Sequence, residues 1–494
     1  MSKETNELLK QCADIPKVEL SDDVEEVIAR SKAFPIPFPI ETVRLEKLKV
    51  RRPIDKLKKN IVSTYPLIHE RVLLLMTHFL IYKREFGSSI EKELYKDMTV
   101  PELIDRILKK RSITFMGPAD KYMLISGEEG LEGWESVGTV NQRPPLLLES
   151  CLSYDEMKLS AMVYVSGHTE CINDGTRKNS GVVSEEGAEK DAVIIGAIGP
   201  RFQRHFRMDY EDILITEEQN VPENGYGEEV TPTTCLNVLK TTYVRNNLSA
   251  KHMWRQMWSE FYQVHSYTYE ELTSYVNIQN NKEADKKYTD RYVRLAKKEH
   301  VFDNEVYYKR ISILAETVLI EANARAQEEG RQAYVNIIGC GLGVWKISKH
   351  QLDVYVLSVV ERVRHLLRRD MLQHVSDVNF AYITPSDGVL ALFKNSSSSG
   401  NDDTEHKVFF ESKRHPEGGI NVQLLSREPS SRLQGADEGK LLVMTYPWDS
   451  NAHPGNEFWM GKLSSSGDPA AACSTQVSEL HNAHINRAVR GDNT

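Results

Sequence analysis

The pattern of hydrophobic and polar positions changes near residue 145 of this 494-residue chain. Before that point, apolar side chains recur at three- and four-residue steps, most clearly over 61–82, and this period predicts helices. Beyond it, continuous apolar runs at 159–165 and 191–199 predict strands that are covered on both faces. The change in period predicts a mostly helical N-terminal region followed by an α/β domain.

Three segments follow from this pattern. Residues 1–45 are predicted to form an extended arm, since alternating prolines at 35, 37 and 39 exclude helix there. The arm either lies on another surface or serves as a linker. Residues 46–135 are predicted to be helical, with a short helix at 100–108 that carries a proline in its first turn. Residues 145–494 are predicted to form one α/β domain with a mixed sheet, because helices and strands alternate along them.

Further elements of the α/β domain can be placed from the same pattern. Helices are predicted at 311–327 and 352–367, and strands at 334–338, 378–383, 420–425 and 440–446. A last helix is predicted from Asp468 to about 488, because Asp before Pro469 is a typical helix start with the aspartate as N-cap.

Composition narrows the class of protein. Hydrophobic residues at 40% and charged residues at 27% fit a soluble globular protein. The net charge of −9 argues against broad affinity for nucleic acid. The most apolar stretch, 72–82, is too short to span a membrane, and the N-terminus lacks the apolar core of a secretory signal. Six cysteines without a CxxC pair favour reduced thiols and a cytoplasmic or nuclear location.

The densest group of polar residues follows the predicted strand 440–446. It contains three carboxylates, two amides and several aromatic side chains: Asp449, Glu457, Asp468, Asn451, Asn456, Trp448, Phe458 and Trp459. Carboxylates can hold a cationic guanidinium, and one of them can act as a general base on water. Cleavage at an anomeric carbon needs carboxylates and no metal or cofactor. The alternatives are a long surface loop and, for Asp468, a helix cap.

A glycine-bearing turn, Gly339, Gly341 and Gly343, follows the predicted strand 334–338. Glycines at such a place let backbone N–H groups approach phosphate oxygens. The spacing matches neither the dinucleotide fingerprint nor the Walker loop, so a tight turn is an equal alternative.

A polar loop, 167–181, follows another predicted strand. Its Asn173 and Asp174 could bind ribose hydroxyls or an adenine edge, or could belong to an ordinary polar loop. The histidines at 453, 481 and 484 show no metal-binding spacing, so no metal site is expected.

Three motifs together resemble a known family. GCGLGVW, which ends at Trp345, YPWDSNAHPGNEFW and SGDPAAACST are similar to the MavL-type macrodomain ADP-ribosylhydrolases, which are selective for ADP-ribose on arginine. The resemblance covers roughly 145–490 and leaves the N-terminal 135 residues outside. It implies a macrodomain-like α/β/α sandwich that binds ADP-ribose near the carboxyl ends of the strands.

The resemblance also assigns residues. Asp449, Glu457 and Asp468 match the acids on which hydrolysis depends in the family, and Gly341 and Gly343 match its phosphate-side loop. The residues expected to bind the substrate are Asn173, Asp174, Gly339, Gly341, Gly343, Trp345, Asn451, Asn456 and Phe458.

The expected activity is hydrolysis of mono-ADP-ribose from arginine side chains of proteins, without metal or cofactor. The expected partners are ADP-ribose and mono-ADP-ribosylated proteins, with no nucleic acid and no membrane. Two alternatives stay open: a non-catalytic reader of ADP-ribose, and a scaffold that uses the N-terminal helices.

Overall fold

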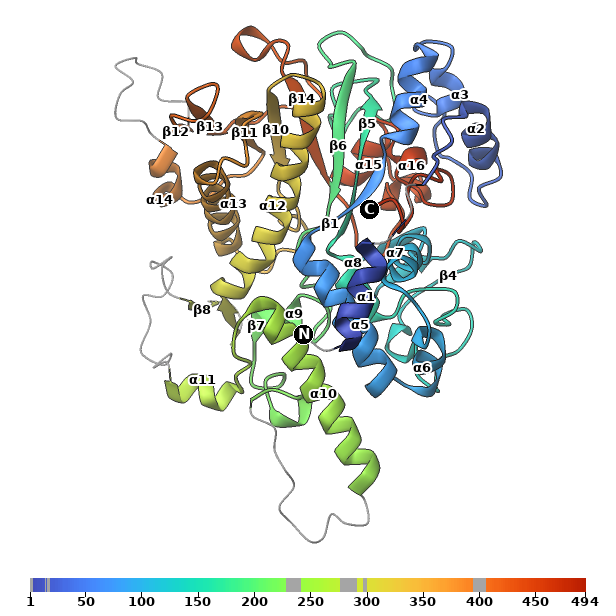
Figure 1. The fold of residues 1–494 in the computed structure, drawn as a ribbon, viewed down its shortest axis with the longest axis vertical. Helices are drawn as coiled ribbons and strands as arrows, with labels where there is room; N and C mark the ends of the chain where they lie inside the picture. Colours follow the sequence, from blue (N-terminus) through green and yellow to red (C-terminus); the bar gives the residue numbers. More distant parts are fainter. Residues whose placement is uncertain are drawn as a thin grey trace.

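The computed structural model describes residues 3–13, 15, 18–227, 241–275, 291–295, 300–393 and 406–494. The largest sheet of these residues has eight strands in the order β1-β5-β6-β14-β10-β11-β13-β12 (Figure 1). Strands β6, β14, β10, β11 and β13 run parallel, whereas β5 and β1 at one edge and β12 at the other are antiparallel to their neighbours. The predicted mixed sheet is therefore confirmed.

The parallel strands β6, β10 and β14 are apolar along nearly their whole length, which suits strands covered on both faces. Their bounds agree with the predicted ones to within a few residues. The sheet consists of β1 (Tyr65–Ile68), β5 (Val163–Glu170), β6 (Asp191–Ala197), β10 (Ala333–Ile338), β11 (Val375–Ala381), β12 (His406–Glu411), β13 (Gly419–Leu424) and β14 (Leu441–Pro447).

Two long helices cover the parallel part of the sheet. Helix α12 (Asn304–Glu328) packs against β6, β10, β11 and β14 and pairs with α13 (His350–Arg368). The two helices contain the predicted ranges 311–327 and 352–367. The start of α12 is fixed by Asp303, whose side chain accepts the backbone N–H groups of Glu305 and Val306. The predicted strand at 159–165 is partly wrong, because α8 (Tyr154–Ser160) occupies its first residues and β5 begins only at Val163.

The N-terminal region contains more than the predicted helices. Strand β1 joins the edge of the main sheet, and β2 (Thr114–Met116), β3 (Lys121–Met123) and β4 (Glu129–Gly130) form a small sheet of their own. The predicted arm, 1–45, is extended only around its prolines. The helices are α1 (Lys3–Ala13), α2 (Val24–Lys32), α3 (Leu45–Leu48), α4 (Ile54–Val62), α5 (Glu70–Phe86), α6 (Ser89–Tyr95) and α7 (Val100–Lys109).

The N-terminal helices lie against the C-terminal segment, at the right of Figure 1. The Arg30 guanidinium on α2 donates to the carbonyls of His484 and Ile485. Buried Glu479 on α16 (Val477–Leu480) accepts the Leu45 backbone N–H at 2.6 Å. The first hundred residues are thus packed onto the α/β domain rather than separate from it.

A segment between β6 and α12 contains a second small sheet and the helices α9, α10 and α11, in the lower part of Figure 1. Its described elements are α9 (Tyr210–Ile213), β7 (Leu214–Ile215), α10 (Thr241–Tyr262), α11 (Tyr269–Tyr275), β8 (Tyr292–Arg294) and β9 (Val301–Asp303). Helix α10 buries Trp254, Met257, Trp258 and Phe261, which recur at helical spacing along one face. Throughout the described part of the chain, no helix is long and apolar enough to cross a membrane.

The helix predicted from Asp468 to 488 is much shorter. It is α15 (Gly467–Ala472), and its N-cap is Ser466 rather than Asp468. A further short helix, α16, follows after a turn. Asp468 lies inside the first turn of α15 and accepts no hydrogen bond from that helix, so its side chain is free to serve another purpose.

Candidate active site

A cavity of about 640 Å³ opens at the carboxyl ends of β10, β11 and β14. Ile338, Ala381 and Pro447, at the ends of these three strands, all line it. Loop 175–178 forms one wall, and α15 forms another. Ligands of open α/β sheets bind outside the carboxyl ends of the strands, so this cavity is the candidate site.

The glycine turn after β10 reaches this cavity. Gly339 and Gly343 line it, and a side chain at Gly343 would meet no atom within 4 Å. Gly341 has a different reason to be glycine. Its φ is +77°, and a Cβ there would lie 2.7 Å from the Pro200 carbonyl oxygen. Two of the three glycines therefore line the cavity, and the third fits the turn against the loop after β6.

Asn173 and Asp174 shape the opposite wall. The Asn173 amide donates to the carbonyls of Val182 and Cys473, and its oxygen accepts the Gly175 N–H. Asp174 accepts the Thr176 N–H at 3.0 Å. The cavity wall itself is made by the residues that follow, from Gly175 onward. The two side chains order this wall, and binding of a ribose or an adenine by them stays a prediction.

The first acid, Asp449, follows the end of β14 directly. It is buried, accepts the Asn451 backbone N–H at 2.8 Å, and lies 3.4 Å from the Arg201 guanidinium. Burial raises the pKa of Asp449 to about 6, although the positive charge of Arg201 opposes the shift. Asp449 thus changes charge close to neutral pH.

The second acid, Asp468, is buried and only half satisfied. One carboxylate oxygen accepts the Gly455 N–H at 2.6 Å, while the other is buried without a hydrogen-bond partner. Burial raises the pKa of Asp468 well above its usual value, and the charges of Glu457 and Asp449 add to the shift. An unpartnered buried carboxylate oxygen costs stability and is typical of a functional site.

The third acid, Glu457, is the most accessible of the three. It lies on η8 (Asn456–Met460), is half-buried, and accepts a hydrogen bond from Ser466 at 3.2 Å. Ser466 precedes Gly467, which lines the cavity. The negative charge of Glu457 raises the pKa of both Asp449 and Asp468, so the three carboxyl groups share one electrostatic environment.

The other predicted residues of this stretch divide into two kinds. Both polar side-chain atoms of Asn451 are buried without a partner, so its amide is available to a ligand. Asn456 instead bonds the backbone N–H and carbonyl of Phe115, both at 2.9 Å. Phe458 is completely buried and packs edge-on against Trp459. Asn456 and Phe458 therefore hold η8 in place.

Sequence reasoning missed the contribution of the N-terminal region to this site. Ser112 pairs with the acidic loop through hydrogen bonds with Asn451 and His453. Phe115 on β2 holds Asn456, as described above. Asp120, in the turn between β2 and β3, bonds the same Arg201 that pairs with Asp449. None of these residues belongs to a recognisable motif, although an arginine directly after a strand and Gly199-Pro200 is a signal that could have identified Arg201.

The proline-containing arm also reaches the site. The rings of Phe34 and Phe38 lie 5.3 Å and 5.0 Å from the ring of Trp459 on η8. The Arg44 guanidinium lies over the Phe38 ring, at 4.6 Å. The arm therefore lies on another surface of the protein, which is one of the two roles predicted for it. That surface is η8, the element that carries Glu457.

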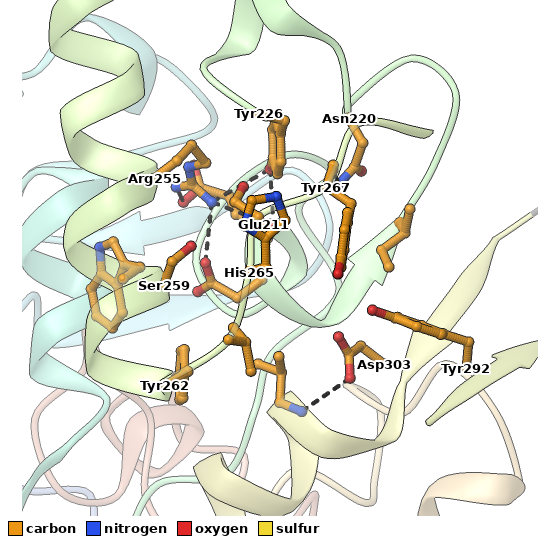
Figure 2. Close-up of a pocket in the computed structure, with 16 residues that line it drawn as sticks. Glu211, Asn220, Tyr226, Arg255, Ser259, Tyr262, His265, Tyr267, Tyr292 and Asp303 are labelled. Carbon is orange, nitrogen blue, oxygen red and sulfur yellow. Dashed lines mark hydrogen bonds and ion pairs between the residues drawn. The ribbon is translucent and has the colours of Figure 1, made fainter. Parts of the chain in front are cut away.

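A smaller pocket lies in the segment between β6 and α12, away from the acids (Figure 2). Its volume of about 40 Å³ is too small for a nucleotide. Burial disfavours a charge on Glu211, but Arg255 and Lys158 outweigh it and lower its pKa to about 2. Arg255 and Lys158 also pair with Asp212, at 3.1 and 2.6 Å. The two carboxylates, Glu211 and Asp212, form ion pairs with the two cations, Arg255 and Lys158, so we interpret this group as a structural ion-pair cluster.

His453 and His484 are stacked on each other, and His481 bonds the Tyr446 hydroxyl at 3.1 Å. Within the described ranges, no group of three or more His, Cys, Asp or Glu side chains is arranged to hold a metal ion.

Comparison with known proteins adds independent evidence. The sequence model of the family described as "ADP-ribosylhydrolase MavL-like" matches residues 25–494. The match begins well before residue 145, so the expectation that the N-terminal region lies outside the resemblance is wrong. This agrees with the contacts that Ser112, Phe115 and Asp120 make with the acidic loop.

Two relatives from Drosophila melanogaster are similar over nearly the whole chain. The ADP-ribosylarginine hydrolase CG3568 is 40% identical over 493 residues, which are 98% of this chain and 87% of the relative. The ADP-ribosylarginine hydrolase CG2909 is 36% identical over 485 residues, 97% of this chain and 87% of the relative.

Proposed function

This chain belongs to the MavL-like ADP-ribosylhydrolase family, and from that premise we propose that it removes mono-ADP-ribose from arginine side chains of proteins. The observation that carries the proposal is that three carboxyl groups share one electrostatic environment. Two of them, Asp449 and Asp468, closely follow Pro447 and Gly467, which line the cavity of about 640 Å³ at the carboxyl ends of the strands. Both relatives are named ADP-ribosylarginine hydrolases, which agrees with it.

The fold we propose is macrodomain-like. In its support, parallel strands form the middle of a mixed sheet, helices α12 and α13 cover it, and the cavity opens at the strand ends. The backbone of Gly339 and Gly343 would hold the diphosphate, because neither residue has a side chain that would keep phosphate oxygens away. The loop ordered by Asn173 and Asp174 would lie along the adenosine side.

At the other end, the acids would hold the modified guanidinium and the ribose next to it. Asp449 and Glu457 are proposed to carry the negative charge that pairs with the guanidinium. Asp468, with its raised pKa and unpartnered oxygen, would keep its proton and donate to a ribose oxygen. The free Asn451 amide would add a further hydrogen bond.

The reaction breaks the bond between the anomeric carbon and the guanidino nitrogen, and the electron pair stays on that nitrogen. A water oxygen forms the new bond to the anomeric carbon, and Glu457 takes the proton of that water. The proton then returns to the neutral guanidine, which leaves as a positively charged arginine side chain. The transition state carries positive charge on the ribose, which nearby ionised carboxylates stabilise.

A non-catalytic reader is the second candidate, because the same cavity would bind ADP-ribose without turnover. The crowding of three acids favours the enzyme, since their mutual repulsion destabilises a folded protein and a reader of neutral ribose gains nothing from it.

Calorimetry with free ADP-ribose, followed by release of ADP-ribose from an arginine-modified peptide, separates the candidates. The proposal expects both binding and release. Binding without release would support the reader, and the absence of both would support a scaffold.

A further inference from the structure

Arg201 is a buried cation held between two carboxylates. Its guanidinium lies 3.4 Å from Asp449 and 3.1 Å from Asp120. The rings of Phe115 and Trp345 lie 4.4 and 5.5 Å from the guanidinium carbon. Both ion-pair partners and both rings restrict its position, so Arg201 is a fixed charge rather than a mobile surface group.

Asp120 is fully buried and is fixed in turn. The Tyr154 hydroxyl donates to one of its oxygens at 2.6 Å, and Arg201 donates to the other. Arg204, at 3.6 Å, is a more exposed second cation near the same carboxylate. The pairing of Asp120 with Arg201 joins the N-terminal region to the acid that follows β14.

From this geometry we infer that Asp120 and Arg201 are positioning residues that set the orientation and charge of Asp449. The inference rests on the proposed function and adds two positioning residues to it, neither of which belongs to a recognisable motif. Arg201 favours the ionised form of Asp449, and Asp120 weakens this effect by sharing the same guanidinium. The two residues therefore act on Asp449 in opposite directions.

Several charged groups besides Arg201 act on Asp449. Arg201 and the buried Arg111 carry positive charge toward it. Glu457, Asp120 and Asp468 carry negative charge or a proton toward it. Arg111 has only neutral hydrogen-bond partners, Ser160 and the Val163 carbonyl, whereas Arg201 bonds two carboxylates. Arg201 is therefore the cation whose effect on Asp449 depends on Asp120.

The two substitutions have opposite expected effects. In Arg201→Gln, Asp449 loses its paired cation, and the acidic limb of kcat/KM against pH should move up by about one to three pH units. In Asp120→Asn, which preserves size and the bond from Tyr154, Arg201 pairs with Asp449 alone. The acidic limb should then move down, by a smaller amount. Arg201→Lys should restore most of the wild-type limb, because it keeps the charge.

The experiment measures release of ADP-ribose from an arginine-modified peptide between pH 4.5 and 9 (roughly the range in which a raised carboxyl pKa is visible). Arg204→Gln is the matched control, because it removes a cation that lies near Asp120 but not one that pairs with Asp449. The acidic limb of its kcat/KM profile should stay near that of the wild type. A merely structural role would lower kcat without opposite limb shifts. Equal limbs in all variants, or shifts in the same direction, would overturn the inference.

A second readout does not need turnover. The raised pKa of Asp449 means that folding favours its protonated form, so this group's contribution to the free energy of unfolding declines from about pH 4 to about pH 6. In Arg201→Gln the decline should extend to higher pH, and in Asp120→Asn it should end at lower pH. A wild type without turnover would overturn the proposed function, and unchanged stability profiles would overturn the inference.

Discussion

The contact between the proline-containing arm and η8 supports a quantitative prediction for Phe34→Ala. The Phe34 ring is buried against Trp459 and also lies about 6 Å from the rings of His453 and His484. A buried phenylalanine removes ~150–250 Å² from water, which corresponds to about 4–6 kcal/mol at ~25 cal/mol per Å². An alanine side chain retains part of this burial free energy, and Phe→Ala substitutions in protein cores typically lower the free energy of unfolding by about 3–5 kcal/mol.

A loss of that size leaves a domain of ordinary stability folded, since the free energy of unfolding is typically ~5–15 kcal/mol. The activity should fall more than the loss of stability alone implies, because η8 carries Glu457. A displacement of about 1 Å at a catalytic group can cost ~100-fold in rate. Binding of free ADP-ribose should change only a few fold, because the glycine turn that would hold the diphosphate follows β10, whereas the arm packs on η8.

The assay is urea unfolding of wild type and Phe34→Ala, together with calorimetry and turnover on folded protein. Phe409→Ala is the control, because that ring is 37% exposed and lies on β12, the edge strand separated from β14 by β10, β11 and β13. It should cost much less stability and leave turnover unchanged. A folded Phe34→Ala variant with wild-type stability and full turnover would refute the view that the arm supports the site.

Three further predictions follow from the site. Gly343→Val should weaken ADP-ribose binding in a folded protein, because a branched side chain would fill the open space beside the turn; unchanged affinity by calorimetry would mean that the turn does not hold phosphate. Asp468→Asn should raise the free energy of unfolding at pH 7 by about 1 kcal/mol and lower turnover on the order of a hundredfold. The stability gain should vanish below about pH 4, where the carboxyl group is protonated in both states, and urea unfolding at both pH values tests this. Wild-type kcat/KM should rise from pH 5 to 7 as Asp449 ionises near pH 6; a flat profile over that interval would contradict a required charge on Asp449.

Local patterns predicted the main part of the fold. Strands 334–338 and 440–446 and the helix on 352–367 lie close to the observed β10, β14 and α13, because apolar periodicity reflects burial directly. The same logic placed Asp449 and Glu457 after a strand end. The prediction that Asp468 is the N-cap of the last helix is wrong. Asp before Pro is a typical helix start, but in the structure Ser466 is the N-cap.

Contacts between distant segments were not predictable in this way. Asp120 and Arg201 are 81 residues apart, and Arg201 and Asp449 are 248 apart, so no periodicity links them. The prolines around Phe34 and Phe38 predicted an extended backbone but contained no information about which surface it would meet. Only the three-dimensional structure shows that this surface is the ring of Trp459.

The most direct test of the proposed function compares release of ADP-ribose from matched arginine, serine and glutamate peptides by wild type and Glu457→Gln. Only the arginine linkage offers a delocalised cation with several N–H donors to the acids. Leaving the carboxylates unmatched costs several kcal/mol, so a preference of roughly a hundredfold or more is expected at ~1.4 kcal/mol per decade.

Glu457→Gln nearly preserves size but removes the basic oxygen, so turnover of the arginine peptide should fall on the order of a hundredfold. Free ADP-ribose should still bind within a few fold of wild type. Glu438→Gln is the matched control, since this exposed glutamate precedes β14 at the end opposite the acids, and it should be fully active. We expect arginine-selective release that depends on Glu457; equal rates on all three linkages or a fully active Glu457→Gln enzyme would contradict the proposed function.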